Sequence, residues 1–142
     1  MKAFFYIITF SLLIFSCGSS EITDENFTDL IDMENPPEIT FEEEEINFGT
    51  IVEGKQIYRK INFKNTGKGP LLISDVNGSC GCTIPKNWPK EPVKVGESAS
   101  LEVHFNSEGR PGETNKYIII SANTNPRDSK IKITGTVVGP TN

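Results

Sequence analysis

Residues 56–65, QIYRKINFKN, alternate between apolar and polar side chains. The apolar residues Ile57, Ile61 and Phe63 fall on one side of an extended chain, and Tyr58 and Lys60 are among those on the other. Side chains of a β-strand point alternately to its two faces, so a period of two predicts a strand with one buried face.

The same alternation recurs toward the C-terminus, over residues 101–106 and 130–134. Further strands are predicted over 39–48, 71–76 and 117–122. Turn-forming pairs such as Glu53-Gly54 and Asn77-Gly78 separate these segments. Strands of this length and spacing, with no long helical pattern, predict an all-β fold, an antiparallel immunoglobulin-like sandwich of about seven strands. Residues 85–92, PKNWPKEP, are expected to be a stiff connection in which Trp88 covers one end of the core.

The N-terminus resembles the signal of a bacterial lipoprotein. Lys2 precedes an apolar run from Ala3 to Phe15 that is too short to span a bilayer comfortably. The run ends in Ile14-Phe15-Ser16-Cys17, which resembles a lipobox, although Phe15 is bulkier than the usual residue at that place. The resemblance implies cleavage after Ser16 and a lipid anchor on Cys17.

The chain therefore divides into three predicted parts. Residues 1–16 are a signal peptide, residues 17–37 a flexible, acidic tether, and residues 38–142 the sandwich. Cleavage of the signal peptide removes Lys2 and changes the formal charge of the chain from −5 to −6. This negative charge argues against nucleic acid and anionic lipid headgroups as partners. The expected location is the extracytoplasmic side of the cell envelope, and Gly18 after Cys17 hints at the outer membrane.

Six short motifs carry a resemblance to a known family. They are Ile46–Gly54 (INFGTIVEG), Phe63–Gly67 (FKNTG), Pro70–Ile73 (PLLI), Ser79–Thr83 (SCGCT), Trp88-Pro89 and Phe105–Ser107 (FNS). Their order and spacing resemble the domain-of-unknown-function fifteen-seventy-three family. The resemblance covers about residues 39–138 and implies an immunoglobulin-like fold, common in lipoproteins and secreted proteins of Bacteroidetes-type bacteria. The biochemical role of that family is not established.

The pair Cys80-Gly81-Cys82 is the sharpest chemical feature of the sequence. On a straight strand the two side chains would point to one face about 6.7 Å apart, whereas a disulfide needs Cβ atoms about 4 Å apart. A bridge therefore requires a bend at Gly81. Three interpretations stay open: two structural cysteines, packed or bridged; a redox-active dithiol; or a soft-metal site such as Cu(I), for which His104 and Met33 are the remaining imidazole and thioether.

Other polar residues give little sign of catalysis. His104 falls on the polar side of its predicted strand, where a lone histidine is more often solvated than catalytic. The acidic run Glu42–Glu45 is expected to be a solvated edge strand rather than a Ca²⁺ site, because successive strand carboxylates point to opposite faces.

The function predicted from the sequence is binding or structural support at the cell envelope, without catalysis, cofactor or metal. The partners expected are the membrane, through the lipid anchor, and a protein or an envelope polymer, but no nucleic acid. The contact surface is expected at the loops around Asn77–Thr83 and Arg110–Glu113. The alternative is a thiol-redox or Cu(I)-handling protein built on Cys80 and Cys82, and a hydrolase ranks third.

Overall fold

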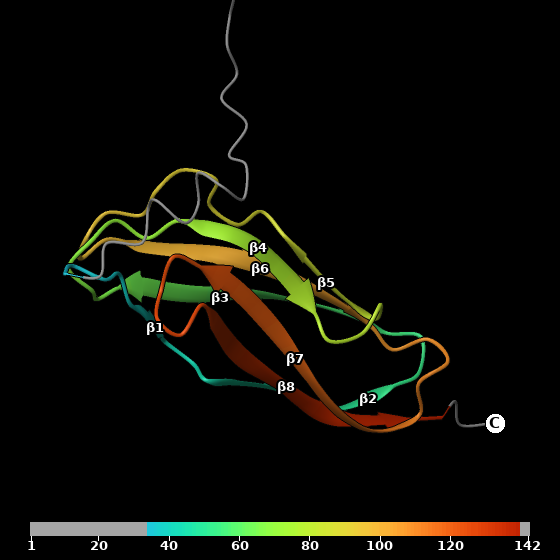
Figure 1. Cartoon of the computed structure of the whole chain (residues 1–142). Helices are drawn as coiled ribbons and strands as arrows, with labels where there is room; N and C mark the ends of the chain where they lie inside the picture. Colours follow the sequence, from blue (N-terminus) through green and yellow to red (C-terminus); the bar gives the residue numbers. More distant parts are fainter. Residues whose placement is uncertain (1–33, 140–142) are drawn as a thin grey trace, which may run out of the picture.

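The computed structural model of the chain describes residues 34–139 (Figure 1). The predicted signal peptide, the predicted lipid site at Cys17, Met33 and most of the predicted tether lie outside the described residues. Within them the chain forms eight strands: β1 (Ile39–Phe41), β2 (Glu45–Val52), β3 (Gln56–Asn65), β4 (Ile73–Gly78), β5 (Thr83–Lys86), β6 (Ser98–Asn106), β7 (Gly112–Ala122) and β8 (Asp128–Val138).

The strands form two four-stranded sheets that face each other (Figure 1). One sheet has the order β1-β3-β6-β5 and the other β2-β8-β7-β4. The predicted all-β, immunoglobulin-like sandwich is confirmed, with eight strands where the pattern predicted about seven. One pairing differs from the antiparallel prediction, because β2 runs parallel to β8, with Ile46 opposite Ile133.

The predicted strand over 39–48 is two strands in different sheets. β1 pairs with β3, and β2 pairs with β8 in the other sheet. The chain crosses between the sheets at Glu42–Glu44, where all side chains are exposed. A run of glutamates cannot alternate between a buried and a solvated face, so the crossing falls where the apolar pattern is interrupted.

β5 was predicted as part of a stiff connection, yet Thr83–Lys86 pairs with β6. Pro85 is tolerated because β5 is an edge strand. The even-numbered residues of β6 direct their backbone N–H and C=O groups toward β5, as the bond from Asn106 N to Cys82 O shows. Pro85 lies opposite the odd-numbered Val103, so its backbone nitrogen points away from the sheet and no hydrogen bond is lost. Trp88 packs against the core, as expected.

The main core lies between the two sheets. Its largest side chain is Phe63, which is 1% exposed, and Ile61 lies beside it in β3 with 4% exposure. The inward face predicted for residues 56–65 is thus buried as expected. Leu71, Leu101, Ile118, Ile120 and Ile131 are fully buried in the same cluster.

The chain enters the sandwich at residues 35–38, beside the β3–β4 loop. Thr66 N donates to Glu38 O and Lys68 N donates to Pro36 O, both at 2.9 Å. Pro37 is buried, and a Cβ on Gly67 would lie 2.3 Å from Glu38 N, so only glycine lets the two backbones approach. Pro36 and Pro37, predicted as the end of the tether, are therefore held against the sandwich.

Different interactions hold the chain segments together at the two ends of the sandwich. We call the end where the chain enters the N-terminal end, and the opposite end, which carries the Ser79–Cys82 crossing, the disulfide end (Figure 1, left and right). The side chain of Asn65, fully buried, organises the N-terminal end: its Nδ2 donates to Gly69 O and Val93 O, and its Oδ1 accepts from Gly67 N and Glu38 N.

Candidate functional site

Cys80 and Cys82 are joined by a disulfide, with their Cα atoms 5.2 Å apart. This separation is shorter than the extended spacing because the chain turns at Gly81, where Thr83 N donates to Cys80 O at 3.2 Å. Gly81 is exposed and no atom lies within 4 Å of where its Cβ would be. The bend expected at this glycine is thus present and points to solvent.

The bridged residues form the crossing from β4 in one sheet to β5 in the other. Ser79 N donates to Tyr117 O on the β4 side, and Asn106 N donates to Cys82 O on the β5 side. Gly78 lies so close to β5 that a Cβ there would be 2.1 Å from Thr83 O. The disulfide therefore sits in a short connection that is attached to both sheets.

The sulfur atoms have unequal surroundings. Cys82 is 2% exposed and packs in a small cluster with Phe105 and Val137, whereas Cys80 is only half-buried at the margin of that cluster. We call this group, with the half-buried Phe48, Ile51 and Ile57, the disulfide-end cluster. In the bridged form neither cysteine offers the thiolate that a metal ion binds. Among residues 34–139, no group of three or more His, Cys, Asp or Glu side chains is placed to hold a metal.

His104 lies away from the cysteines, on the outer face of β6. Phe105, the next residue, points inward to the disulfide-end cluster. The His104 ring stacks on Tyr58 with ring centroids 4.5 Å apart and an angle of 6° between the planes. Gln56 Oε1 accepts a hydrogen bond from the Tyr58 hydroxyl and lies 3.1 Å from His104 Nε2. The polar-face position predicted for His104 is confirmed.

Three strands bring a row of side chains together on this outer face. Tyr58 in β3 is opposite His104 in β6, which is opposite Ile84 in β5. We call Tyr58, His104 and Ile84 the outer row. Tyr58 is 66% exposed and Ile84 44% exposed, so two large apolar side chains lie in solvent on one face of the sheet.

A charged row runs parallel to the outer row. Glu102 in β6 is opposite Lys60 in β3 and Lys86 in β5, and Asn87 Nδ2 donates to Glu102 Oε2 at 2.8 Å. Between the two rows lies an open hollow of about 440 Å³. Sequence reasoning did not identify this surface as a site. The available signal was Tyr58, an aromatic residue on the polar side of a half-buried strand.

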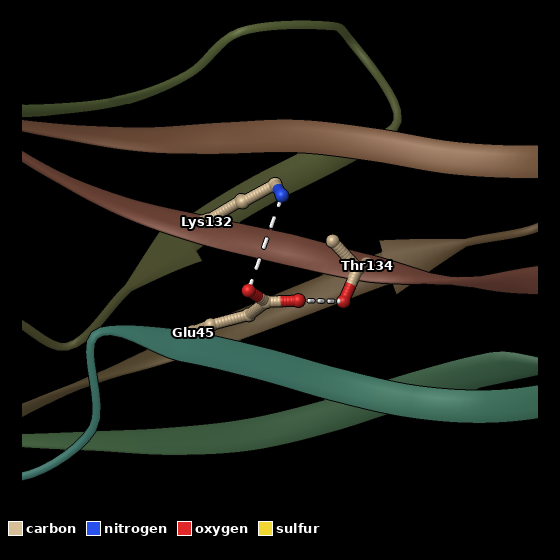
Figure 2. A network of polar contacts seen from close by, with 3 residues as sticks. All are labelled: Glu45, Lys132 and Thr134. Carbon is tan, nitrogen blue, oxygen red and sulfur yellow. Dashed lines mark hydrogen bonds and ion pairs between the residues drawn. The ribbon is translucent and has the colours of Figure 1, made fainter.

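The acidic run does not converge on a single point. Glu42 accepts a hydrogen bond from Asn62 Nδ2 in β3, whereas Glu45 is the first residue of β2 in the other sheet. Figure 2 shows Glu45 between Lys132 Nζ, 3.9 Å from its carboxylate, and the Thr134 hydroxyl, which donates to it. The carboxylates are thus divided between two sheets.

Of the two segments predicted as contact loops, Asn77–Thr83 is buried at one end and Arg110–Glu113 runs into a strand. Thr83 and Cys82 are buried, and Gly112 and Glu113 belong to β7. The other residues of Asn77–Thr83 are exposed or half-buried, and all of Arg110–Glu113 is exposed.

Comparisons with known proteins give a family and a fold. The model of a family described as "Protein of unknown function (DUF1573)" matches residues 39–137. A search of curated proteins gave no match. Among residues 34–139 no helix has the length and apolar character needed to cross a membrane.

Several solved structures are similar in fold. A protein of unknown function from Porphyromonas gingivalis W83 has a TM-score of 0.58 and 19% identity, over 72% of this chain and 46% of that one. The secreted serine protease VesC from Vibrio cholerae has a TM-score of 0.56 and 11% identity, over 70% and 23%. PapD-like domain 7 of human CEP192 has a TM-score of 0.55 and 9% identity, over 75% and 89%. The chain thus spans less than half of the first two proteins, and at these identities the likeness shows the fold alone.

Proposed function

This chain belongs to the DUF1573 family of proteins of unknown function, and from that premise we propose that it is a non-catalytic binding module whose contact surface is the outer row. The observation that carries the proposal is the exposure of Tyr58 and Ile84 on one face of the sheet β1-β3-β6-β5. Large apolar side chains that gather in solvent commonly mark interaction sites. This surface differs from the loops that the sequence favoured.

The outer row is also preorganised for contact. The Tyr58 ring stacks on His104 and its hydroxyl donates a hydrogen bond to Gln56, and both contacts favour one orientation of the ring. A tyrosine held in one rotamer loses little conformational entropy on binding, which is why tyrosine serves so often as a contact residue. The charged row beside it supplies polar groups that can orient a partner.

We place the module at the cell envelope, anchored by lipid on Cys17. The lipobox-like residues before Cys17 support the anchor. The Cys80–Cys82 bridge supports an extracytoplasmic location, since disulfides persist mainly in oxidising compartments. Growth of the producing bacterium with labelled palmitate tests this part: wild type should carry label and Cys17→Ala should not. An unlabelled wild type would contradict the anchor.

Catalysis is not expected from this surface. The His104 ring is stacked on Tyr58, and no serine or cysteine lies opposite His104 in β3 or β5. The thiol-redox or Cu(I) alternative is disfavoured because Cys82 is buried in an apolar cluster. A screen with esterase, peptidase, glycosidase and phosphatase substrates should show no turnover. Turnover that His104→Ala abolishes would refute the non-catalytic proposal.

The binding proposal is tested by photo-cross-linking in the native cell. A photoreactive side chain at position 84 should capture a partner, and Tyr58→Ser should reduce the yield by about tenfold, because removal of a central aromatic contact typically costs at least 1–2 kcal/mol of binding. Val95→Ser is the matched control, since Val95 is 54% exposed but lies in the turn before β6, outside the outer row. Equal yields from Tyr58→Ser and wild type would contradict the outer row as the contact surface.

A further inference from the structure

The first half of β3 forms an unpaired sheet edge. β3 pairs with β6 along its whole length, but on its other side β1 covers only Phe63–Asn65, and Glu42 N adds one bond to Asn62 O. Beyond that point the chain crosses to the other sheet. Among residues 34–139, no strand pairs with the outer side of Gln56–Lys60, which we call the open edge.

The register shows which backbone groups are available. Glu38, Thr40 and Glu42 lie opposite Thr66, Lys64 and Asn62, so the even-numbered residues of β3 point their N–H and C=O groups toward the β1 side. The odd-numbered residues point toward β6, as the bond from Ser107 N to Lys55 O shows. On the open edge, the backbone groups of Gln56, Tyr58 and Lys60 therefore point away from β6, and of these the Tyr58 carbonyl accepts a bond from Arg59 Nη1.

The other sheet edges are protected against strand addition. β5 carries Pro85, and β1 has only three residues. β2 has a register shift between Asn47 and Thr50, with Gly49 at φ +69°. β4 has a shift between Ile73 and Asp75, and the Asp75 carboxylate accepts the N–H of Val76. Bulges, prolines and short strands are the usual means by which proteins block edge pairing. The open edge has none of these.

The β3 residues of the open edge carry positive charge, and Glu42 and Glu43 lie beside Lys60 at one end of it. Lys60 and Arg59 are both exposed, and no acidic residue occurs in β3. Arg59 occupies an inward-facing position between Ile57 and Ile61, and its Nη1 lies 3.4 Å from Tyr58 O at the edge. Two copies of this edge would repel each other. An acidic strand would instead be attracted, because its carboxylates would face these cations.

We propose that the open edge binds an extended acidic segment of a partner protein by adding it as an antiparallel strand beside Gln56–Lys60. The proposal rests on the proposed binding function and names the partner's chemistry. Antiparallel pairing matches β1 and β6, and main-chain bonds would supply affinity while side chains supply specificity. The partner would place carboxylates opposite Lys60 and Arg59 and an apolar residue opposite the half-buried Ile57. Its outward side chains would extend the outer row past Tyr58.

The test titrates the chain from residue 17, made soluble by Cys17→Ser, with the capped peptide Thr-Glu-Asp-Thr-Val-Thr, followed by amide NMR. The amide protons of Tyr58 and Lys60 should gain protection from exchange, while those of Ile57 and Arg59, already bonded to β6, should change little. The neutral peptide Thr-Gln-Asn-Thr-Val-Thr should bind about tenfold more weakly, because it loses both carboxylate contacts to Lys60 and Arg59. Protection that does not alternate, or equal binding of both peptides, would overturn the proposal.

Variants separate the contribution of side-chain charge to binding from that of the backbone hydrogen bonds. Arg59→Glu should weaken the acidic peptide at least tenfold, whereas Lys64→Glu, the same change in the half of β3 that β1 covers, should have little effect. Lys60→Pro removes an outward N–H without breaking a β6 bond and should abolish binding, while Lys60→Ala keeps that N–H and should retain most of it. Binding that survives both Arg59→Glu and Lys60→Pro would overturn strand addition.

Two further outcomes are decisive. If Tyr58→Ser abolishes capture in cells but Arg59→Glu and Lys60→Pro leave it intact, the outer row stands as the contact surface and strand addition is refuted. Residues 24–27, Asp-Glu-Asn-Phe, carry the same order of charge and apolar side chain. If Asp24→Asn with Glu25→Gln removes protection of Tyr58 and Lys60 that was present before peptide was added, the occupant is a segment of this chain and the partner assignment is wrong.

Discussion

The two ends of the sandwich are held closed by different interactions. At the N-terminal end, loops and the entering chain are joined by hydrogen bonds to one buried amide, that of Asn65. At the disulfide end, a covalent bridge and the stacked rings of Phe48 and Phe105, 5.2 Å apart, close the interior. Hydrogen bonds specify where backbone segments lie, whereas apolar contacts tolerate more variation. The comparison therefore predicts a different sensitivity to substitution at each end.

The largest loss of stability is expected from Phe105→Ala at the disulfide end. Phe105 is 2% exposed and packs on Phe48 and Cys82. Truncation of a buried phenylalanine leaves a cavity and costs roughly 3–5 kcal/mol. Chemical denaturation followed by circular dichroism measures the change, and Phe63→Ala in the main core should give a similar value. A loss below about 1 kcal/mol would mean that the disulfide end can collapse around the cavity.

Asn65→Ala should cost nearly as much, about 3 kcal/mol, because several buried backbone groups lose their partner at once. The expected signature differs from that of Phe105→Ala. Amides of Gly67 and Glu38, which donate to Asn65 Oδ1, should exchange faster even where the fold remains intact. Asn62→Ala, in the same strand but at a less buried position, is the control and should change stability by less than about 1 kcal/mol. If Asn65→Ala and Phe105→Ala changed amide exchange in the same way, the distinction between the two ends would be removed.

Replacing both cysteines by alanine should cost about 2 kcal/mol. Closing so short a loop contributes only about 1.5 kcal/mol in the chain-entropy model, and the remainder comes from lost packing around Cys82. In the native oxidised protein, iodoacetamide should label neither cysteine, and after reduction it should label the half-buried Cys80 before Cys82. Rapid labelling of Cys82 in the folded, reduced protein would instead favour the redox interpretation.

The smallest effect on stability is expected from Tyr58→Ala, which belongs to neither end. Its side chain is mostly in solvent, so the free energy of unfolding should change by less than about 0.5 kcal/mol. The same variant should impair partner capture. A large loss of stability would indicate that the Tyr58–His104 stack supports the fold rather than a contact surface.

Period-two patterning predicted the interior well because it reports burial directly. Ile61, Phe63, Leu101 and Ile131 were placed on inward faces by alternation alone, and all are buried. Alternation does not report which strand lies beside which, so the parallel β2–β8 pair was not predicted. Pro85 concealed β5, because proline is excluded from central strands but tolerated where its nitrogen faces solvent.

The candidate site was harder to predict for a related reason. Tyr58, His104 and Ile84 come from three segments of the sequence and meet only through strand register. The sequence assigned Tyr58 and His104 to outward faces, but one chain segment cannot show that they are neighbours. The bend at Gly81 was predictable because it depends on local geometry, namely the spacing that a bridge between Cys80 and Cys82 requires.

The attachment of residues 35–38 to the β3–β4 loop also sets a limit on distance. If lipid is on Cys17, as we propose, only the seventeen residues 18–34 separate the membrane surface from the segment 35–38, which is bonded to Thr66 and Lys68. At a maximum of about 3.6 Å per residue, that length cannot exceed roughly 60 Å. The open edge begins at the opposite end of β3, about 30 Å further along the strand. A partner that reaches it must therefore extend to within roughly 90 Å of the bilayer, which restricts it to proteins of the membrane surface and the layer next to it.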